Sequence, residues 1–356
     1  MHPVALMKTR VVMRDVAKAS GVHYATVSRA LRNDPRISSA MRTRVQAVAK
    51  RLGYTPDPLL RALADYRTTN QRRNFHGLLA WLTNFPTSDG WKEYEKIDYF
   101  EGASRRAREL GYKLEVFWAR EPGVTPARLR QIMLARGILG VLLPPQPLGG
   151  TTMDLRLGGL ASVSFGHTLT KPTLNVVHHY HFRSMWLLLE KLRGLGYRRP
   201  GLVMPNDVHK NVERAWAGAW MMYAKEYDLT PPPLFLEEVQ TAEGVLGWYR
   251  EHKPDVVIAN QGYVLEWLRN AGVRVPRDCG FALTAKHAGP PSCAGIDEKN
   301  ELTGASAVEL LVSAIQHGET DVPKHPKSLL IEGSWFPGNT VRKVTTKKQP
   351  GPLKPA

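Results

Sequence analysis

The sequence predicts a small all-α module followed by a much larger α/β domain of doubly wound parallel sheets. Apolar residues recur at helical spacing up to about residue 54, and from Phe75 onward short apolar runs alternate with amphipathic stretches. Charge is divided in the same way, because fifteen Lys and Arg against four Asp in residues 1–73 carry +11 of the total +17. A basic head on a near-neutral body is typical of a polyanion-binding module attached to a module that binds a small molecule or a protein.

Residues 14–32, RDVAKASGVHYATVSRALR, predict a helix-turn-helix. Val16 and Val27 mark two short apolar faces at helical spacing, and Ser20-Gly21 separates them where glycine permits a tight turn. The outward face of the second helix combines aromatic, hydroxyl and guanidinium groups, a mixture that can read a major groove. Its residues are Tyr24, Ala25, Ser28, Arg29 and Arg32.

A third helix is predicted to begin after Ser38, a good N-cap, and to end at Gly53. Asp57-Pro58 can then begin a short helix that would not be stable by itself. We therefore place a headpiece at residues 1–56 and a hinge helix with its linker at residues 57–74.

The run from Asp15 to Leu31, with Ile37-Ser38 and the segment 52–56, closely resembles the DNA-binding headpiece of the lactose-repressor (LacI/GalR) family of bacterial transcription regulators. The family pattern AxxAGVSxxTVSRxLN falls on residues 17–32, with His23 in place of Ser and Arg32 in place of Asn. Both departures lie at positions that face DNA in the family.

Double-stranded operator DNA is accordingly the expected partner of the headpiece. Tyr24 and Ala25 are expected to meet base edges, and Arg29 is expected to make a bidentate contact to guanine. Thr26 and Ser28 are expected to hold phosphates. A surface salt bridge to the nearby Asp34 is the alternative for Arg29.

The segment after the headpiece matches the hinge of the family. The resemblance implies that two hinge helices of a homodimer fold on the operator and wedge a leucine into the minor groove, and Leu63 matches that leucine. The alternative is that Leu59, Leu60 and Leu63 pack as an ordinary linker.

The rest of the chain reads as strands alternating with helices. Buried parallel strands are predicted at 77–82, 113–118, 138–143, 160–165, 201–204, 234–236, 255–259 and 280–283. Helices are predicted at 97–110, 126–136, 183–195, 213–227, 243–252, 262–271 and 301–317. Because the number of strands is high for one sheet, two doubly wound sheets are expected.

Short motifs from Phe100-Glu101-Gly102 to Glu332-Gly333-Ser334-Trp335 resemble the periplasmic-binding-protein-like (type I) effector domain of the same family. The resemblance implies a two-lobed effector-binding and dimerisation domain at 75–340, crossed by three chain segments with a ligand cleft between the lobes. Lobe 1 is expected at about 75–173 plus 300–327, and lobe 2 at about 174–299 plus 328–340. The basic tail, 341–356, is expected to be disordered.

The resemblance also places effector-binding residues. They are Asn260 after the strand DVVIAN, with Asn84, Arg214 and Thr284. The family's arginine falls on Ala215 beside Arg214, its aspartate is Thr284, and a second frequent aspartate is His178, which argues against an ordinary hexose or sugar-phosphate pocket. Further cleft candidates are Thr83, Tyr99, His167, Trp216 and Trp220, with core packing as the alternative for the tryptophans.

Other classes of site find little support in the sequence. Cys279 and Cys293 are too few for a disulfide framework, which favours a reducing cytoplasm. The start MHPVALMKTR is too short for a signal peptide, and no apolar run reaches the length of a membrane span. No metal site is expected, because His178, His179 and His181 lack a Cys or paired carboxylate at ligand spacing. Enzyme motifs are missing, so neither catalysis nor a cofactor is expected.

We therefore expect a homodimeric transcription regulator, most often a repressor in this family, whose operator affinity is controlled by a small-molecule effector, with a sugar as a candidate class. One alternative is an effector-independent regulator whose cleft has decayed. The other is a solute-binding protein or enzyme built on the same lobes, against which the basic helix-turn-helix argues.

Overall fold

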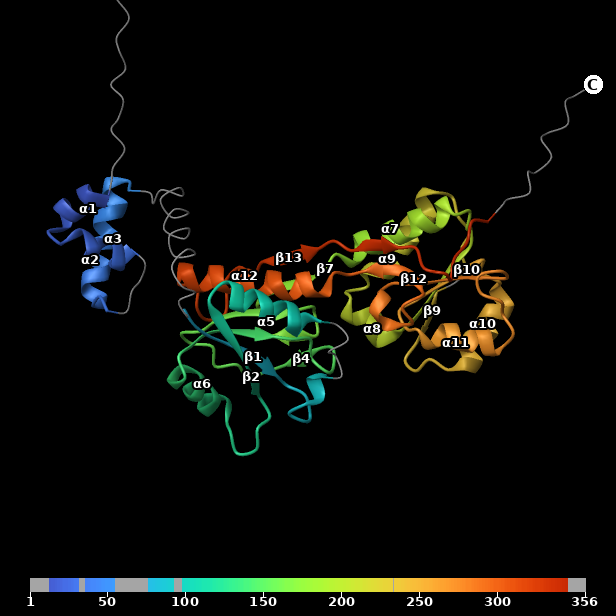
Figure 1. Cartoon of the computed structure of the whole chain (residues 1–356), viewed down its shortest axis with the longest axis horizontal. Helices are drawn as coiled ribbons and strands as arrows, with labels where there is room; N and C mark the ends of the chain where they lie inside the picture. The colour runs from blue at the N-terminus through green and yellow to red at the C-terminus, as the bar shows by residue number, and fades with distance from the viewer. Residues whose placement is uncertain (1–12, 32–35, 55–75, 93–97, 233, 345–356) are drawn as a thin grey trace, which may run out of the picture. The chain divides into compact units, whose positions relative to one another are not determined.

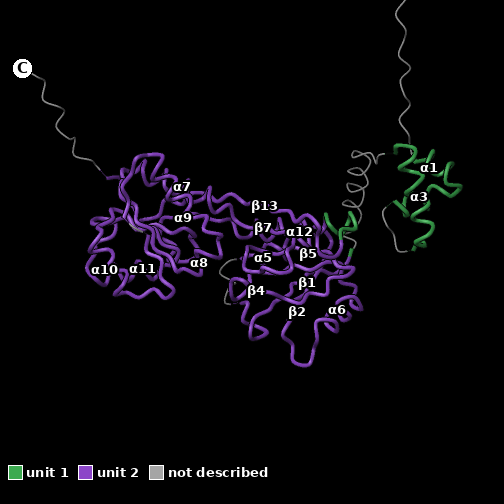
Figure 2. The backbone as a smooth tube through the Cα atoms, turned by 180° about the vertical axis from the view of Figure 1, so that it is seen from behind, with its two compact units in different colours: residues 1–76, 313–319 green, residues 77–312, 320–356 purple. Residues whose placement is uncertain are grey.

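The computed structural model describes residues 13–31, 36–54, 76–92, 98–232 and 234–344. The chain divides into two compact units, residues 1–76 with 313–319 and residues 77–312 with 320–356 (Figure 2). Arg32, Leu63, the hinge predicted at 57–74 and most of the basic tail lie outside the described residues.

Three helices form the N-terminal bundle: α1 (Met13–Ser20), α2 (Tyr24–Leu31) and α3 (Ser39–Leu52) (Figure 1). Gly21 makes the turn after α1 with a φ of 65°, which glycine adopts without a steric penalty. The side chain of Ser38 caps α3, and Gly53 ends it in the left-handed conformation. The core of the bundle consists of Val16, Ala17, Val27, Ala30, Val45 and Ala49.

The first lobe is built on a six-stranded parallel sheet with the order β13-β7-β5-β3-β1-β2. Its strands are β1 (Gly77–Thr83), β2 (Tyr112–Trp118), β3 (Ile138–Leu143), β5 (Ala161–Phe165), β7 (Asn175–His179) and β13 (Ser328–Ile331). Its helices are α5 (Tyr99–Glu109), α6 (Pro126–Ala135) and α12 (Asn300–His317). A small two-stranded sheet of β4 (Thr151–Thr152) and β6 (Leu169–Lys171) accompanies them.

The second lobe has its own six-stranded sheet, with the order β14-β12-β11-β10-β8-β9 and only β14 antiparallel. Its strands are β8 (Pro200–Pro205), β9 (Phe235–Glu237), β10 (Val256–Ala259), β11 (Gly280–Leu283), β12 (Ala294–Asp297) and β14 (Ser334–Phe336). Its helices are α7 (His181–Gly194), α8 (Asn206–Asn211), α9 (Ala215–Glu226), α10 (Ala242–His252) and α11 (Tyr263–Asn270), with a short 3-10 turn, η2 (Lys286–Ala288). The predicted fold class, a helix-turn-helix region followed by two doubly wound lobes, is confirmed.

The chain crosses between the sheets three times, from β7 to α7, from β12 to α12 and from β13 to β14. The sequence placed the first and third crossings at 173/174 and 327/328, but β7 and β13 pair with each other in the first sheet. Both strands therefore belong to lobe 1, and the crossings fall after residues 179 and 331. The error has a physical cause: β7 ends in two histidines, and the edge strand β13 leaves Leu329 and Leu330 partly exposed, so neither reads as a buried apolar strand.

Two glycines let α5 and α12 pack backbone against backbone. A Cβ atom on Gly102 would overlap the carbonyl oxygen of Glu301, and one on Gly304 would overlap the carbonyl oxygen of Tyr99. The glycine of the Phe100-Glu101-Gly102 motif is thus required by the close approach of α12, the helix that follows the second crossing.

We expect Gly304→Ala to lower the free energy of unfolding of the α/β domain by about 1–3 kcal/mol or more, because backbone rather than a movable side chain occupies the added volume. Urea unfolding followed by circular dichroism measures the change. Gly247→Ala, on α10 with no atom within 4 Å of its Cβ position, is the matched control and should raise stability by up to about 1 kcal/mol. Equal effects of the two substitutions would contradict the close packing of α5 on α12.

Candidate functional site

The second helix of the bundle, α2, presents an open face. Tyr24 is 51% exposed, and Ala25 and Arg29 are exposed, whereas Val27 and Ala30 are buried in the bundle core. Thr26 and Ser28 are half-buried at the edge of this face. A helix whose outward residues offer aromatic, methyl and guanidinium groups has the groups that contact base edges and phosphates in a major groove.

His23, one of the two departures from the family pattern, caps this helix. Its Nδ1 accepts a hydrogen bond from the backbone N–H of Ala25 at 3.3 Å, so an imidazole does here what a serine hydroxyl does at an N-cap. The cap requires an unprotonated Nδ1, and it fixes where α2 begins.

Two side chains of α3 hold the helix-turn-helix together. Arg44 donates from Nη2 to the carbonyl oxygen of Ser20 at 3.0 Å, and Gln46 donates to the carbonyl oxygen of Ala30 at 3.3 Å. Both acceptors lie at the carboxyl ends of α1 and α2, where helix carbonyls lack partners within the helix. Arg44 therefore has a structural role, which its place in a basic sequence does not indicate.

In the second lobe, Asn260 and Thr284 lie side by side where β10 and β11 end. The two strands pair up to Ala259 and Leu283, and the N–H of Thr284 donates to the carbonyl oxygen of Ala259 at 2.9 Å. Asn260 is 6% exposed and Thr284 is 1% exposed, yet Asn260 Oδ1 and Thr284 Oγ1 have no hydrogen-bond partner in the described part of the chain. Buried polar atoms of this kind are costly unless something pairs with them.

The two other predicted effector residues lie in different surroundings. Asn84 follows β1 in the first lobe and accepts a hydrogen bond from Arg120 Nε at 3.1 Å. Arg214 is exposed, with a φ of 64° directly before α9. The structure therefore brings Asn260 and Thr284 together, and it places Arg214 on the surface.

The two tryptophans of α9 differ in their environment. The indole of Trp220 donates to the carbonyl oxygen of Pro200 at 3.1 Å in the lobe core. Trp216 is 4% exposed, its Nε1 has no hydrogen-bond partner among the described residues, and its ring meets that of His181 edge-on at 5.1 Å. Trp216 thus adds an unpaired donor, and Trp220 is an ordinary core residue.

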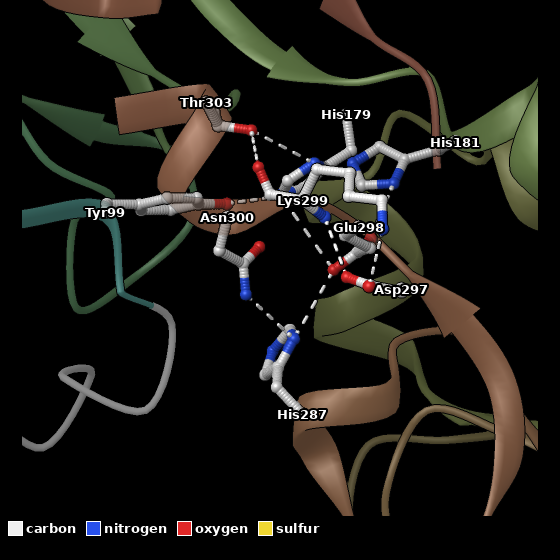
Figure 3. A network of polar contacts seen from close by, with 9 residues as sticks. All are labelled: Tyr99, His179, His181, His287, Asp297, Glu298, Lys299, Asn300 and Thr303. Carbon is white, nitrogen blue, oxygen red and sulfur yellow. Dashed lines mark hydrogen bonds and ion pairs between the residues drawn. The ribbon is translucent and has the colours of Figure 1, made fainter. Parts of the chain in front are cut away.

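Residues from two of the three chain crossings meet in one network, in which a carboxyl group lies among imidazoles (Figure 3). Glu298, directly after β12, is 5% exposed. Its carboxyl oxygens lie 3.6 Å from His287 Nδ1, 3.7 Å from His181 Nδ1 and 3.9 Å from His179 Nε2. The phenol of Tyr99 from α5 bonds His179 at 2.7 Å, and Asn300 bonds His287 at 3.3 Å. The network joins α5, β7 and α12 of lobe 1 to α7 and η2 of lobe 2.

Burial keeps this network uncharged at neutral pH. It raises the pKa of Glu298 to about 8, with a smaller contribution from the carboxylate of Asp297. Burial also lowers the pKa of His179 to about 3 and that of His181 well below 6.5, and the neighbouring imidazoles act in the same direction. The contacts between Glu298 and the imidazoles are therefore contacts between neutral groups rather than ion pairs.

Two further histidines of lobe 1, His167 and His178, lie in contact with each other, and His167 also contacts lobe 2. His167, after β5, lies 3.3 Å from His178 at the end of β7, and 3.4 Å from the carboxylate of Glu213, which precedes α9 in lobe 2. Burial, reinforced by the neighbouring His167, lowers the pKa of His178 to about 4. The part of the chain that the structure describes contains no group of three or more His, Cys, Asp or Glu that could hold a metal ion.

Sequence reasoning missed the centre of the network. Glu298 lies in the run Asp297-Glu298-Lys299-Asn300, which resembles a solvated turn, and only its position after β12 distinguishes it. His287 was missed for the same reason, because its partner is distant in the sequence. Among the described residues, no helix is long and apolar enough to cross a membrane.

Two family sequence models match the chain. "Bacterial regulatory proteins, lacI family" matches residues 12–57, the helix-turn-helix region, and "Periplasmic binding protein-like domain" matches residues 189–340. The members of the first family are regulators rather than enzymes.

The chain is similar to full-length regulators. It is 26% identical to the HTH-type transcriptional regulator CelR of Thermobifida fusca over 338 residues, which cover 89% of this chain and 95% of CelR. The solved CelR–cellobiose complex has a TM-score of 0.54 at 22% identity, covering 93% of this chain and 100% of that one. The lac repressor dimer bound to operator and the anti-inducer ONPF has a TM-score of 0.53 at 18% identity, covering 94% and 100%. The chain belongs to the LacI family of bacterial regulatory proteins, and it is a DNA-binding transcription regulator.

Proposed function

We propose that this regulator is a cytoplasmic, homodimeric repressor whose operator affinity responds to an uncharged, hydroxyl-rich small molecule held at the carboxyl ends of the lobe 2 strands. The observation that carries the effector proposal is the pair of buried polar atoms without partners there, Asn260 Oδ1 and Thr284 Oγ1, among the described residues. The repressor dimer on operator DNA, to which this fold is similar, supports the homodimer and the sign of regulation.

On the DNA side, α2 enters the major groove in this proposal. Tyr24 and Ala25 meet base edges, Thr26 and Ser28 hold phosphates, and Arg29 contacts a guanine. Arg32 extends the same face, and Leu63 wedges into the minor groove; both lie outside the described residues. The exposure of Tyr24, Ala25 and Arg29 supports these roles.

The effector proposal follows from the charge of the cleft groups. The unpaired atoms are an amide oxygen of Asn260, which accepts, and the hydroxyl of Thr284, which can donate and accept, and no Lys or Arg is among the buried side chains of the described residues. A phosphate or carboxylate placed there would lose its hydration without gaining a countercharge. Hydroxyl groups can both donate and accept, so a neutral carbohydrate satisfies both atoms. The complex of the relative CelR with cellobiose supports this class.

Coupling between the two sites follows from linkage. The crossings that carry the Glu298 network connect the lobes, so an effector that binds one lobe arrangement better than another shifts the population of the two. The shift reaches the DNA through the segment that joins the headpiece to lobe 1. The mechanism requires only that the effector bind one lobe arrangement more tightly than the other.

For the DNA interface, we expect Arg29→Ala to weaken operator binding by about 1–3 kcal/mol and to relax base preference, while weakening binding to random DNA much less. Competition binding with operator and random duplexes at fixed salt measures the ratio. Arg44→Ala is the structural counterpart: it should lower the free energy of unfolding of the headpiece by about 1 kcal/mol, because the carbonyl of Ser20 loses its donor. If Arg29→Ala lost the same affinity on both duplexes, its role in base recognition would be wrong.

For the effector site, Asn260→Ala and Thr284→Val should each weaken binding of a neutral saccharide at least tenfold and leave operator affinity of the free protein unchanged, because the DNA contacts lie in another module. Calorimetry with cellobiose first, then with a panel of neutral mono- and disaccharides, tests the class. Asn270→Ala, at the exposed end of α11, is the matched control. Binding of gluconate or glucose 6-phosphate that is weakened in Asn260→Ala would contradict the uncharged class, and a melting point unmoved by every neutral compound would favour the effector-independent regulator.

The Glu298 network predicts that stability falls with rising pH near neutrality. The folded pKa of Glu298, about 8, lies above its ordinary value of 4.5, so its contribution is fully present below pH 4.5 and is lost as pH rises to 8. The lowered histidine pKa values act in the opposite sense, but only below their ordinary value of 6.5. Between pH 6.5 and 8, the free energy of unfolding should therefore fall by on the order of 1 kcal/mol per pH unit.

Glu298→Gln removes the ionisable group and keeps its shape, so its stability should be nearly flat over this window. Urea unfolding at pH 6.5, 7.25 and 8 measures the slope. Glu266→Gln, on the exposed side of α11, should keep the wild-type slope. Parallel pH profiles for the wild type and Glu298→Gln would show that Glu298 does not carry the effect.

A further inference from the structure

The connection between β3 and β5 in lobe 1 runs without a helix. The connections from β1 to β2 and from β2 to β3 contain α5 and α6, but residues 144–160 hold only the two-residue strand β4. An open space results between α6 and the segment 152–157. This pocket is about 240 Å³ in volume, and Leu82, Leu129, Met133 and Leu157 form its apolar part.

Three guanidinium groups line the same pocket, against one carboxylate. Arg130 on α6 donates to the carbonyl oxygen of Gly158 at 2.8 Å and so holds the far wall in place. Arg156 pairs with Asp154, with contacts of 3.1 and 3.2 Å. Arg120, after β2, donates from Nε to Asn84. Its Nη groups have no partner in the described part of the chain. The net charge of the lining is therefore positive, and Arg120 keeps donors that face no acceptor.

We propose that this pocket binds the phosphate group of a small phosphorylated metabolite, with Arg120 and Arg130 as the anion-binding residues and the apolar floor against the organic part. The two Nη groups of Arg120 match two oxygens of a phosphate, as a guanidinium does. Arg130 adds its Nη1 group, because its Nε and Nη2 both donate to the carbonyl oxygen of Gly158, and the two positive charges balance a dianion. The ion pair of Arg156 with Asp154 is neutral as a unit, so it bounds the pocket without repelling the ligand.

The site is separate from the proposed effector cleft in both position and charge. It lies in lobe 1 between α6 and the β3–β5 connection, whereas Asn260 and Thr284 end strands of lobe 2. Asn84, one of the predicted effector residues, itself lines this pocket at the end of β1 and holds Arg120 there. A phosphate on the Nη groups of Arg120 fixes the same guanidinium that Asn84 holds through Nε, so occupancy of the pocket bears on the edge of the sheet from which Asn84 extends.

Calorimetry and thermal melting of the full chain with inorganic phosphate, glycerol 3-phosphate and glucose 6-phosphate test the proposal, with glycerol and glucose as uncharged partners. We expect saturable binding of a phosphorylated compound and at least a tenfold loss of affinity in Arg120→Gln and in Arg130→Gln. Arg128→Gln is the matched control, because Arg128 lies exposed on the same helix but outside the pocket lining. Arg29→Ala controls for binding of phosphate to the headpiece, and Asn260→Ala controls for the cleft; all three should bind as the wild type does.

Several results would overturn the assignment. An equal loss in Arg128→Gln would mean nonspecific attraction to a basic surface, and a loss in Arg29→Ala would move the binding to the headpiece. Acetate or gluconate binding as tightly as the phosphorylated compounds would contradict phosphate recognition, and no saturable binding would exclude the site. Because Arg130 also holds the segment at Gly158, Arg130→Gln can lower stability; Arg120→Gln, which breaks no contact to the backbone, then decides the question.

Discussion

The main constraint on this domain is the burial of polar groups at the chain crossings. These groups lose their contact with water and must find partners or stay uncharged. Glu298 is buried directly after β12, and the imidazoles that approach it come from the β7–α7 crossing, which is distant in the sequence, and from η2. An ionised carboxylate in that position would require a charged partner, but the imidazoles are themselves too buried to be protonated. The group remains neutral instead, and its pKa rises. The lobes are thus joined by a network whose stability depends on keeping protons in place.

The same constraint explains why the unpaired groups of lobe 2 point to a ligand. At the crossings, Tyr99 bonds His179 and the Asn300 amide bonds His287, and the carboxyl of Glu298 lies 3.7 Å from His181, so these groups at least approach one another. Asn260 Oδ1 and Thr284 Oγ1, at the ends of adjacent strands, have no hydrogen-bond partner among the described residues. Parallel strands bring their carboxyl ends to one edge of a sheet, which is where ligands bind in α/β folds. Hydroxyl groups of a ligand supply the hydrogen bonds that both atoms lack. The ligand therefore stabilises the lobe arrangement in which the two atoms are buried.

The sequence pattern predicted the elements that are determined by interactions between residues close in the sequence. The three helices of the headpiece, the Ser38 cap and the Gly53 terminus follow from spacing and capping chemistry within a few residues. The eight apolar runs correspond to β1, β2, β3, β5, β8, β9, β10 and β11. The strands β7, β12, β13 and β14 were missed because they are short and carry polar or partly exposed residues, so their pairing depends on neighbours that are distant in the sequence. Glu298 could not be found for the same reason, since its burial depends on η2, β7 and α7, and no residue near it in the sequence reveals that.

Arginines show most clearly what a sequence leaves undetermined. Arg29 and Arg44 occur in a basic stretch and Arg120 beside Glu121, yet Arg29 is exposed on α2, Arg44 caps the carboxyl end of α1, and Arg120 lines a pocket in lobe 1. Their different roles follow from the acceptor that each one contacts among the described residues. Arg29 has no acceptor there, Arg44 donates to a helix carbonyl, and Arg120 donates from Nε to a side-chain amide, which leaves its two Nη groups available. The positions of these charges also determine which class of ligand each part of the molecule attracts. Polyanionic DNA and small anions are attracted to guanidinium groups, while the lobe 2 edge, with neutral imidazoles, a neutral carboxyl and no buried cation, is left to an uncharged ligand. An anionic ligand in lobe 1 and an uncharged ligand in lobe 2 can therefore bind the same domain without competing for one site.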